Sequence, residues 1–324
     1  MNLNTLFSNF KSKKVLIIGD AMIDTYMWGE INRISPEAPV PVVEVKEHES
    51  RLGGAANVAL NIQALGATPI LCSVIGEDNQ ANQFQKLMQQ SKLSNEGILT
   101  SKNRRTTIKT RIIAKNKHQL RVDEEDTKPI DIEEDFIARI KKLIDDSDVV
   151  ILQDYNKGTL TPMIIREVIK ISNTKNIPTI VDPKKENFKC YDRCTIFKPN
   201  LLEIQAGMGV NFNADNISDI ERFSEKLLNK ISARGILLTL SERGISIKSK
   251  ELFKHTPAFE RNVIDVSGAG DTVISVAALC LAEDIDLIDL SKLSSLAGGI
   301  VCESVGVVPI KKDKLLSEAR KHII

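Results

Sequence analysis

A glycine-rich segment near the C-terminal end of the sequence has the composition and spacing of an anion-binding turn. Gly268-Ala269-Gly270-Asp271 stands directly before an apolar run over residues 273–281 that is typical of a buried helix. The N-terminus of a helix attracts oxyanions through its backbone N–H groups. A carboxylate at Asp271 could take the proton from an attacking hydroxyl. On spacing alone the alternative stays open, a capped turn whose carboxylate bonds to helix N–H groups.

A second glycine site lies near the N-terminus. Gly53-Gly54 opens another helical pattern, and Asn57 follows about one turn later. Paired glycines let a ligand approach the backbone, and an asparagine offers both donor and acceptor groups. Asp20 and Asp24 follow the first predicted strand, where open α/β sheets bind ligands, and carboxylates suit the hydroxyls of a polyol. A turn and a helix cap would explain either feature alone, but the two occur together with the segment at 268–271.

Short β-branched runs alternate with helical periods along the chain, which predicts an α/β fold. The apolar spacing over residues 132–144 is that of one helix face, and Thr161-Pro162 is an N-cap followed by proline at the first helical position. This alternation indicates a mostly parallel sheet flanked by helices on both faces. The predicted strands lie at residues 15–18, 70–75, 149–152, 179–181, 195–197 and 236–240.

Two segments instead alternate apolar and polar residues, as half-exposed strands do. They are residues 39–46 and 106–123, the second folding into a hairpin at Lys115-Asn116-Lys117. We expect a small β-sheet lid, formed by about residues 31–48 and 105–124 and inserted in a single domain over 1–324. The lid would also offer a homodimer surface. Edge strands without a functional role are the alternative.

Composition excludes several classes of protein. The 324 residues include 44 Lys and Arg against 43 Asp and Glu, so no basic surplus supports nucleic-acid binding. Five scattered cysteines, without a second Cys/His pair at zinc spacing near Cys190 and Cys194, favour reduced thiols and no protein metal site. No apolar run approaches the roughly 20 residues of a membrane span. We therefore expect a cytoplasmic protein that binds small neutral or anionic ligands and neither nucleic acid nor membrane.

Taken together, these motifs resemble the ribokinase-like (PfkB) family of sugar kinases over essentially the whole chain. Gly53-Gly54-x-x-Asn57 and the late Asp-Val-Ser-Gly-Ala-Gly-Asp segment at 265–271 carry the resemblance. Within the family, the run RISPEAPVPV at 33–42 is similar to the branch that phosphorylates D-glycero-β-D-manno-heptose 7-phosphate for ADP-heptose and lipopolysaccharide synthesis. The segments DYNKG at 154–158, DPK at 182–184 and KPNLLE at 198–203 are similar to the same branch.

The resemblance implies roles for the matching residues and a reaction with ATP and Mg²⁺, with a monovalent cation such as K⁺ left open. Asp271 matches the catalytic base, and Gly268, Ala269 and Gly270 match the anion hole. The nucleotide side comprises Asn200 and Glu203, which the family associates with magnesium and nucleotide phosphates, and Thr239, Ser241, Gly244 and Ser295. Asp20, Asp24, Gly53, Gly54, Asn57 and Asp154 match the sugar side, and Arg33, Lys157 and Lys184 are the candidates for the substrate's own phosphate.

The sequence departs from the family pattern at three places. Ser295 stands where asparagine is common, Gln153 where serine often precedes Asp-Tyr, and Gly306-Val307 where Gly-Thr is usual. None of these positions is expected to touch the phosphate chemistry. Some members of this branch carry an adenylyltransferase domain. The chain ends at Ile324 without a His-x-x-His or His-x-Gly-His arrangement, so we expect a stand-alone kinase whose product is adenylylated by another polypeptide.

Three functional hypotheses follow. The first is ATP-dependent phosphorylation of the anomeric hydroxyl of D-glycero-β-D-manno-heptose 7-phosphate, which gives the 1,7-bisphosphate. The second is a kinase of the same fold that acts on another sugar or sugar phosphate. The third is a non-catalytic sugar or nucleotide sensor. A broken glycine turn or the loss of Asp271 would favour it, but the sequence contains both the turn and Asp271.

Overall fold

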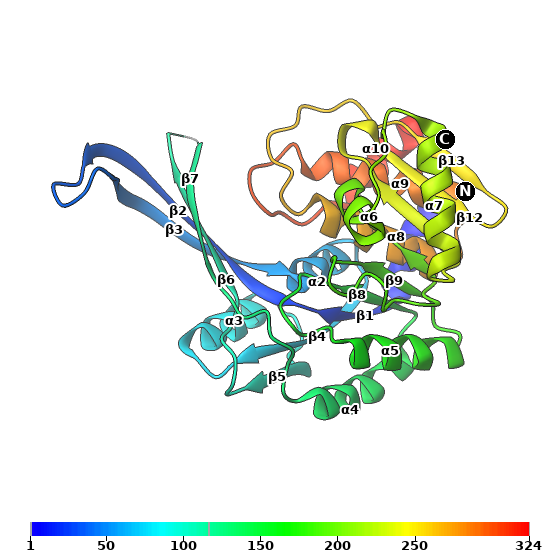
Figure 1. Cartoon of the computed structure of the whole chain (residues 1–324), viewed down its shortest axis with the longest axis horizontal. Helices are drawn as coiled ribbons and strands as arrows, with labels where there is room; N and C mark the ends of the chain where they lie inside the picture. Colours follow the sequence, from blue (N-terminus) through cyan, green and yellow to red (C-terminus); the bar gives the residue numbers. More distant parts are fainter. Residues whose placement is uncertain (1, 116, 324) are drawn as a thin grey trace.

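The apolar runs of the sequence form the central strands of a large, mostly parallel sheet (Figure 1). In the computed structural model, which describes residues 2–115 and 117–323, its strand order is β13-β12-β11-β10-β9-β8-β1-β4-β5. Neighbours from β11 through β5 run parallel, while β12 and β13 pair antiparallel at one edge. The bounds are β1 (Lys14–Gly19), β4 (Thr68–Gly76), β5 (Gly97–Ser101), β8 (Val149–Gln153), β9 (Thr179–Asp182), β10 (Ile196–Phe197), β11 (Gly235–Thr239), β12 (Ile245–Ser249) and β13 (Phe253–Thr256).

Helices cover both faces of this sheet, and each face has its own hydrophobic core. In β1, Val15 and Ile17 pack into one core while Leu16 and Ile18 pack into the other, because successive side chains point to opposite faces. The first core is covered by α1 (Leu3–Asn9), α2 (Ala55–Ala64), α3 (Asn79–Gln90), α8 (Ala269–Ala282), α9 (Leu287–Val301) and α10 (Lys312–His322). The second is covered by α4 (Glu133–Leu143), α5 (Pro162–Thr174), α6 (Leu201–Met208) and α7 (Ile217–Lys230).

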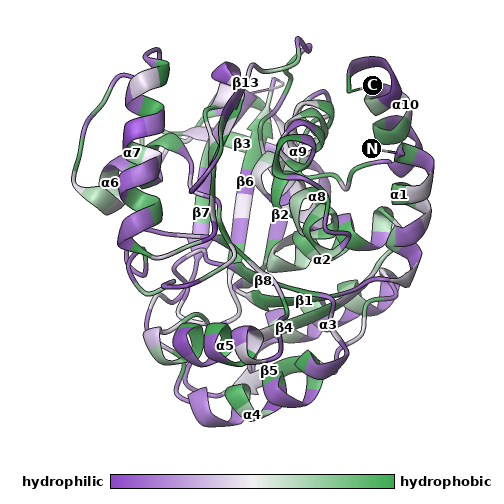
Figure 2. Ribbon diagram, turned by 90° about the vertical axis from the view of Figure 1, so that its right-hand side faces the viewer, coloured by the Kyte–Doolittle hydropathy of each residue, from purple (hydrophilic) through white to green (hydrophobic). Residues whose placement is uncertain are grey.

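Local sequence signals explain where several helices begin. The Thr161 hydroxyl accepts a hydrogen bond from the backbone N–H of Ile164 (3.3 Å), and Pro162 is the first helical residue of α5, as predicted. The surface helices are amphipathic, with their hydrophobic sides turned toward the sheet (Figure 2). Among the helices of the described residues, none is long and apolar enough to cross a membrane. The α/β fold with helices on both faces of a mostly parallel sheet is thus confirmed.

A smaller sheet projects from the body of the molecule beside the main sheet (Figure 1). Its strand order is β3-β2-β6-β7, formed by β2 (Ala21–Ile34), β3 (Pro41–Gly54), β6 (Ile108–Ala114) and β7 (Lys117–Glu124). The predicted β layer is confirmed, and β6 and β7 pair antiparallel on either side of the expected turn, whose central residue Asn116 lies outside the described residues. The sequence did not predict β2 as a strand. The chain passes from the last residue of β1, Gly19, into β2 through Asp20 alone.

The two faces of the small sheet differ in chemistry. Asp24 lies opposite Lys109, and Tyr26 opposite Arg111, so these side chains share one charged face. On β7, Leu120 and Val122 alternate with charged residues; these two side chains are 57% and 44% exposed. Because side chains alternate across a strand, the sheet presents one charged face and one largely apolar face.

Backbone geometry at the end of β3 should make Gly54 sensitive to substitution. Gly54 has φ +58°, and a Cβ there would collide with the carbonyl oxygen of Asp20 and lie 2.8 Å from Met22 Cε. Gly209 has a similar φ of +67° with nothing within 4 Å of the added Cβ. We expect Gly209→Ala to cost about 1 kcal/mol of unfolding free energy from backbone strain, and Gly54→Ala about 3 kcal/mol because the collision adds to the strain.

Urea denaturation of both variants measures this difference. Equal losses of stability would show that the environment of Gly54 relaxes around a methyl group, contrary to the crowding described above.

Candidate active site

Asp271 is the centre of a buried polar cluster at the N-terminus of α8. Its Oδ2 accepts a hydrogen bond from Asn57 Nδ2 (2.7 Å), and its Oδ1 accepts from the Tyr155 hydroxyl (2.6 Å) and from Gln153 Nε2 (3.2 Å). Asp271, Asn57 and Gln153 are all at most 4% exposed. Among the described residues, the bonds to this carboxylate come from side chains of other elements. The capped-turn alternative, with the carboxylate on the N–H groups of its own helix, is therefore wrong.

The protonation of Asp271 follows from this environment. Burial raises the pKa of Asp271 to about 7, and the hydrogen bonds from Asn57 and Tyr155 oppose that rise by favouring the ionised form. Burial also raises the pKa of Tyr155 well above its usual value, as does the neighbouring Asp271 charge, so the phenol stays neutral and donates. A carboxylate poised near neutrality is suited to accept a proton.

The glycine turn beside Asp271 is held in shape by its own hydrogen bonds. Gly268, the N-cap of α8, has the left-handed φ of +77°, and the Ala269 N–H bonds to Val266 O (3.2 Å). Asp265 Oδ1 accepts from the N–H of Ser267 (2.9 Å). Within the described residues, the backbone N–H groups of Gly268, Gly270 and Asp271 donate to no hydrogen-bond acceptor. Of the predicted anion hole, Gly268 and Gly270 thus keep an available N–H at the helix N-terminus, and Asp271 adds a third. Ala269 does not contribute its N–H, because that group is bonded to Val266 O.

A buried ion pair lies next to this turn. Lys198 Nζ is 3.0 Å from Asp182 Oδ2, and both side chains are under 10% exposed. A Cβ on Gly270 would lie 3.9 Å from Lys198 Nζ and 3.8 Å from Asp182 Oδ2. Gln153 Nε2 also donates to Asp182 (3.2 Å), which links the ion pair to Asp271. This places a desolvated cation beside the N–H groups of the turn.

On the predicted sugar side, Asp20 shapes a loop and Asp24 faces a cation. Asp20 accepts from the backbone N–H groups of Tyr155 (2.8 Å), Lys157 (3.0 Å) and Thr159 (3.0 Å). Asp24 forms an ion pair with Arg111 of the small sheet. A Cβ at Gly53 would collide with the Asp24 carboxylate, so the glycine allows this close approach. Gly53, Gly54 and Asn57 lie together where β3 passes into α2.

Asp154 lies one residue before Tyr155 but contacts a different set of residues. It is 1% exposed and accepts hydrogen bonds from the N–H of Asn156 (2.7 Å) and from the Tyr191 hydroxyl (2.8 Å). Burial first, and then the charge of Asp20, raises the pKa of Asp154 to about 6. Its contacts stabilise the loop after β8.

The predicted phosphate-binding cations are not brought together. Lys157 Nζ pairs with Glu125 Oε1 (2.7 Å), and Lys184 pairs with Glu203 on the nucleotide side. Arg33 is exposed near the outer end of β2, opposite Val42 on β3. The structure therefore leaves Arg33 apart from the Asp271 cluster within one chain.

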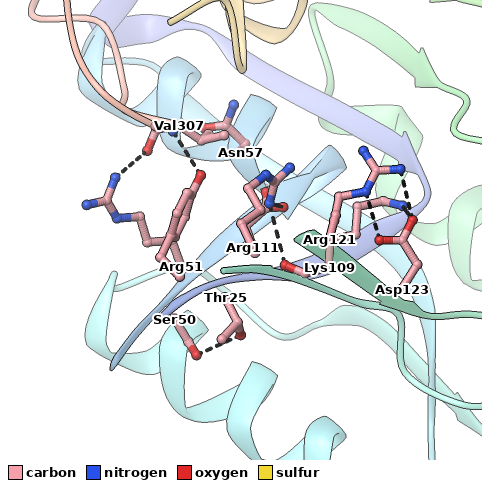
Figure 3. A network of polar contacts seen from close by, with 12 residues as sticks. Thr25, Ser50, Arg51, Asn57, Lys109, Arg111, Arg121, Asp123 and Val307 are labelled. Carbon is pink, nitrogen blue, oxygen red and sulfur yellow. Dashed lines mark hydrogen bonds and ion pairs between the residues drawn. The ribbon is translucent and has the colours of Figure 1, made fainter. Parts of the chain in front are cut away.

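The charged face of the small sheet supplies cations that the sequence interpretation did not include. Arg51 and Arg111 lie on the same side of the sheet as Asn57, while Thr25 and Ser50 bond to each other on the opposite side (Figure 3). Both guanidinium groups stack on Tyr26, at 5.1 Å and 5.4 Å from the ring centroid. Lys109 joins Lys157 through the shared carboxylate of Glu125.

On the predicted nucleotide side, Asn200 and Glu203 form a capping box at the start of α6. Asn200 Oδ1 accepts from the Glu203 N–H (2.8 Å), and Glu203 Oε2 accepts from the Asn200 N–H (2.9 Å). Burial alone would lower the pKa of Lys184, yet the charges of Asp182 and Glu203 raise it above its ordinary value. Asn200 bridges to Thr239 at the end of β11. Ser241 and Gly244 follow in the positive-φ turn before β12, and Ser295 is half-buried on α9.

One sequence expectation is wrong. The departures at Gln153 and Gly306-Val307 were expected to lie away from the phosphate-transfer residues. Gln153 instead ends β8 and donates to Asp271, and a Cβ on Gly268 would lie 3.2 Å from Val307 Cγ1. The reason is topological, because the carboxyl end of β8 and the 306–307 loop both meet the N-terminus of α8.

Four members of the cluster had no role assigned from the sequence. They lie at or just after the ends of neighbouring parallel strands: Gln153 ends β8 and Tyr155 follows it, Asp182 ends β9, and Lys198 follows β10. The rule that ligand sites form at the carboxyl ends of parallel strands, applied to every predicted strand, would have found them.

Comparisons with known proteins identify the class. The model of the pfkB family carbohydrate kinases matches residues 12–313 of the chain. The chain belongs to this family, whose members are phosphotransferases that act on an alcohol group of a sugar. The fold agrees, because the structure is similar to phosphofructokinase-2 from Escherichia coli in complex with potassium (TM-score 0.77, 16% identity, 95% of this chain and 99% of that chain). It is also similar to Arabidopsis thaliana ribokinase complexed with ribose and ATP (TM-score 0.73, 17% identity, 94% and 98%).

Curated relatives at higher identity share a single name. The chain is 40% identical over 312 residues to the "Bifunctional protein HldE" of Campylobacter jejuni strain RM1221, covering 96% of this chain and 66% of that protein. It is 38% identical over 309 residues to the protein of the same name from Aliarcobacter butzleri, covering 94% and 64%. The chain thus spans about two thirds of the length of these relatives.

The raised pKa of Asp271 should appear in the pH dependence of stability. Between pH 4 and 7 the native protein holds a proton that the unfolded chain, with an ordinary aspartate pKa, has released. The contribution of Asp271 to the stability of the wild-type protein should therefore fall through this window as pH rises. Asp271→Asn has no such titration, so its stability relative to wild type should improve by about 2.5 kcal/mol from pH 5 to pH 8.

Chemical denaturation at both pH values measures the change. Asp192→Asn, at a side chain that is 53% exposed, is the matched control and should show no comparable trend. A pH-independent difference for Asp271→Asn would refute the raised pKa.

Proposed function

We propose that the protein uses ATP to phosphorylate the anomeric hydroxyl of D-glycero-β-D-manno-heptose 7-phosphate, in the synthesis of ADP-heptose for lipopolysaccharide. The observation that carries the proposal is the buried Asp271 carboxylate beside three available N–H groups at the start of α8. The heptose assignment is supported by the run at 33–42 and by the relatives at 38–40% identity. A cytoplasmic location is part of the proposal and is compatible with the free cysteines.

In the proposed reaction, the anomeric hydroxyl gives its proton to Asp271 as its oxygen bonds to the γ-phosphorus of ATP. The bond from that phosphorus to the bridging oxygen breaks, and ADP leaves. Catalysis then consists mainly of alignment and charge stabilisation. The N–H groups of Gly268, Gly270 and Asp271 would stabilise the equatorial oxygens, with Lys198 as a nearby cation.

The residues present fit a magnesium ion that arrives with the nucleotide. Within the described residues, no group of three or more acidic, His or Cys side chains is arranged to hold a metal. Mg²⁺ is commonly held by one or two carboxylates together with substrate phosphates and waters, and Glu203 at the start of α6 would supply such a carboxylate. When bound, the ion would neutralise phosphate charge. Dependence on a monovalent cation such as K⁺ is a further part of the proposal.

The small sheet is proposed to close over the sugar and to form a homodimer. Its charged face lies toward Asn57, and Tyr26 accepts a hydrogen bond from the N–H of Val307 (3.2 Å) beside the glycine turn. Its opposite face exposes Leu120 and Val122, which a second copy could cover. Since Arg33 is distant from its own cluster, we propose that it reaches the substrate phosphate of a partner subunit.

A substrate panel with the Asp271→Asn variant tests the proposed reaction. ADP release is measured over sugars and sugar phosphates, and the wild-type enzyme should prefer the heptose 7-phosphate. Asp271→Asn should lose at least about 100-fold in kcat while binding of ATP and sugar phosphate persists, because the proton acceptor is gone. Near-normal kcat in the variant would exclude Asp271 as the base. Preference for another sugar would indicate a sibling kinase, and no release with any substrate would favour a sensor.

The charged face of the small sheet should recognise the substrate's own phosphate. Arg111→Ala should raise the KM for heptose 7-phosphate by about tenfold, because an arginine–phosphate contact is lost, and leave the KM for ATP within about twofold. The KM for heptose without the 7-phosphate should change much less, because Arg111 reaches that sugar only through its ion pair with Asp24. An equal rise of the two KM values would refute the assignment. Arg33→Ala should raise the KM for heptose 7-phosphate if a partner subunit supplies Arg33. This KM should stay unchanged if each chain acts alone.

A further inference from the structure

The Tyr155 hydroxyl makes the shortest hydrogen bond to Asp271. It is 2.6 Å from Oδ1, against 2.7 Å for Asn57 on Oδ2 and 3.2 Å for Gln153 on Oδ1. Tyr155 belongs to the loop that follows β8, whereas Asp271 belongs to α8, so the bond joins two elements 116 residues apart in sequence. The reaction outlined above gives this phenol no role.

The loop that carries Tyr155 is fixed by contacts that do not involve its hydroxyl. The backbone N–H of Tyr155 donates to Asp20, as do those of Lys157 and Thr159. Asn156 takes a left-handed φ of +56°, and its N–H bonds to Asp154. Removing the hydroxyl should therefore leave the loop in place and change only the hydrogen bonding of the Asp271 carboxylate.

The ring of Tyr155 is also held from the nucleotide side. Lys184 Nζ lies 5.8 Å from the ring centroid and is paired with Glu203. The backbone bond to Asp20 and the Lys184 contact thus hold the phenol from two sides. This gives the hydroxyl one orientation, toward Asp271.

Counting lone pairs shows what the hydroxyl does to the carboxylate. Oδ1 accepts from both Tyr155 and Gln153 and is saturated, since a carboxylate oxygen has about two acceptor positions. Among the residues that the structure describes, Oδ2 accepts from Asn57 alone, so it keeps one position for an incoming hydroxyl. The carboxylate cannot rotate without breaking the short bond to Tyr155.

We propose that Tyr155 is a positioning residue, whose phenol holds Oδ1 of Asp271 so that Oδ2 presents its remaining lone pair to the sugar hydroxyl in the ionised state. The proposal rests on the assignment of Asp271 as the base. The other charged groups that face Asp271 are Asp182 from β9, which raises its pKa, and Lys198 after β10, which lowers it. Neither is bonded to Tyr155, so a change at Tyr155 leaves their mutual contact intact.

The variant Tyr155→Phe tests the proposal through the pH profile of kcat. Loss of a donor to the ionised carboxylate should move the acid limb of the profile upward by about one pH unit. With a wild-type pKa of about 7, the ionised fraction at pH 7 then falls about fivefold, and kcat with it, while kcat recovers near pH 9. The KM for the sugar should change less than about twofold.

Tyr191→Phe is the matched control. Its hydroxyl also donates to a buried carboxylate, that of Asp154 (2.8 Å), but does not touch Asp271. This variant should lose similar stability and leave the acid limb in place. An equal shift in both variants, or no shift in either, would overturn the role of Tyr155. A faster Tyr155→Phe enzyme would do so as well, because the phenol would then be blocking the base.

A measurement without substrate separates this proposal from the proposed function. The carboxyl ¹³C resonance of Asp271, assigned by its loss in Asp271→Asn, is titrated in ¹³C-aspartate-labelled protein. Tyr155→Phe should raise its midpoint by about one unit and Tyr191→Phe should not. An unchanged midpoint would overturn the inference even if the enzyme is active. If the wild-type protein is inactive but Tyr155→Phe still raises the midpoint, only the kinase assignment is overturned.

Discussion

The hydrogen bond between Asn57 and Asp271 is the contact on which the rest of the site depends. It joins residues 214 positions apart, one in the first turn of α2 and the other in the first turn of α8, and both are almost fully buried. A carboxylate in this position is costly unless its oxygens are hydrogen-bonded. The two glycine segments must therefore pack closely enough for this contact to form. The large sheet holds them there, because α2 and α8 cover the same face.

The small sheet depends on the same region. Arg51 Nη1 donates to the carbonyl oxygen of Val307 (3.2 Å), and Gly306 N–H bonds to Asp265 (2.8 Å), the residue that also organises the glycine turn. Val307 in turn lies against the position of Gly268. A movement of the small sheet would thus be transmitted to the anion hole through one loop. Under the proposed function, this connection would couple substrate binding on the charged face to alignment of the phosphate.

The fold was largely predictable because its strands are buried on both faces. In β8, residues 149–152 are all apolar and all fully buried, a pattern that fits a central strand of a parallel sheet. The long strand β2 was not predicted, because it follows β1 after the single residue Asp20, and the pair Gly19-Asp20 indicates the end of a strand rather than the start of another. Apolar and polar residues alternate over only part of β2. The face of the sheet to which each of them belongs can be assigned only once β3 and β6 are known to be its neighbours.

The site was predictable where residue type alone suggests chemistry. Asp271 and Asn57 were identified because a carboxylate and an amide stood beside glycine turns. Gln153 and Tyr155 were not, since neutral side chains acquire a role only from the partner they face, and that partner is more than 110 residues away. For Asn200 and Glu203 the spacing of a capping box and the resemblance to a nucleotide site coincide. The structure shows the capping contacts, and the nucleotide role is part of the proposal.

The most direct test of the central claim is ³¹P NMR of heptose 7-phosphate incubated with ATP and the protein. We predict a new phosphate monoester signal, split by the anomeric proton, that grows with ADP in equal amounts in the wild-type reaction and is absent with Asp271→Asn. A wild-type reaction that yields no such signal, or a variant that produces it at the wild-type rate, would contradict the account.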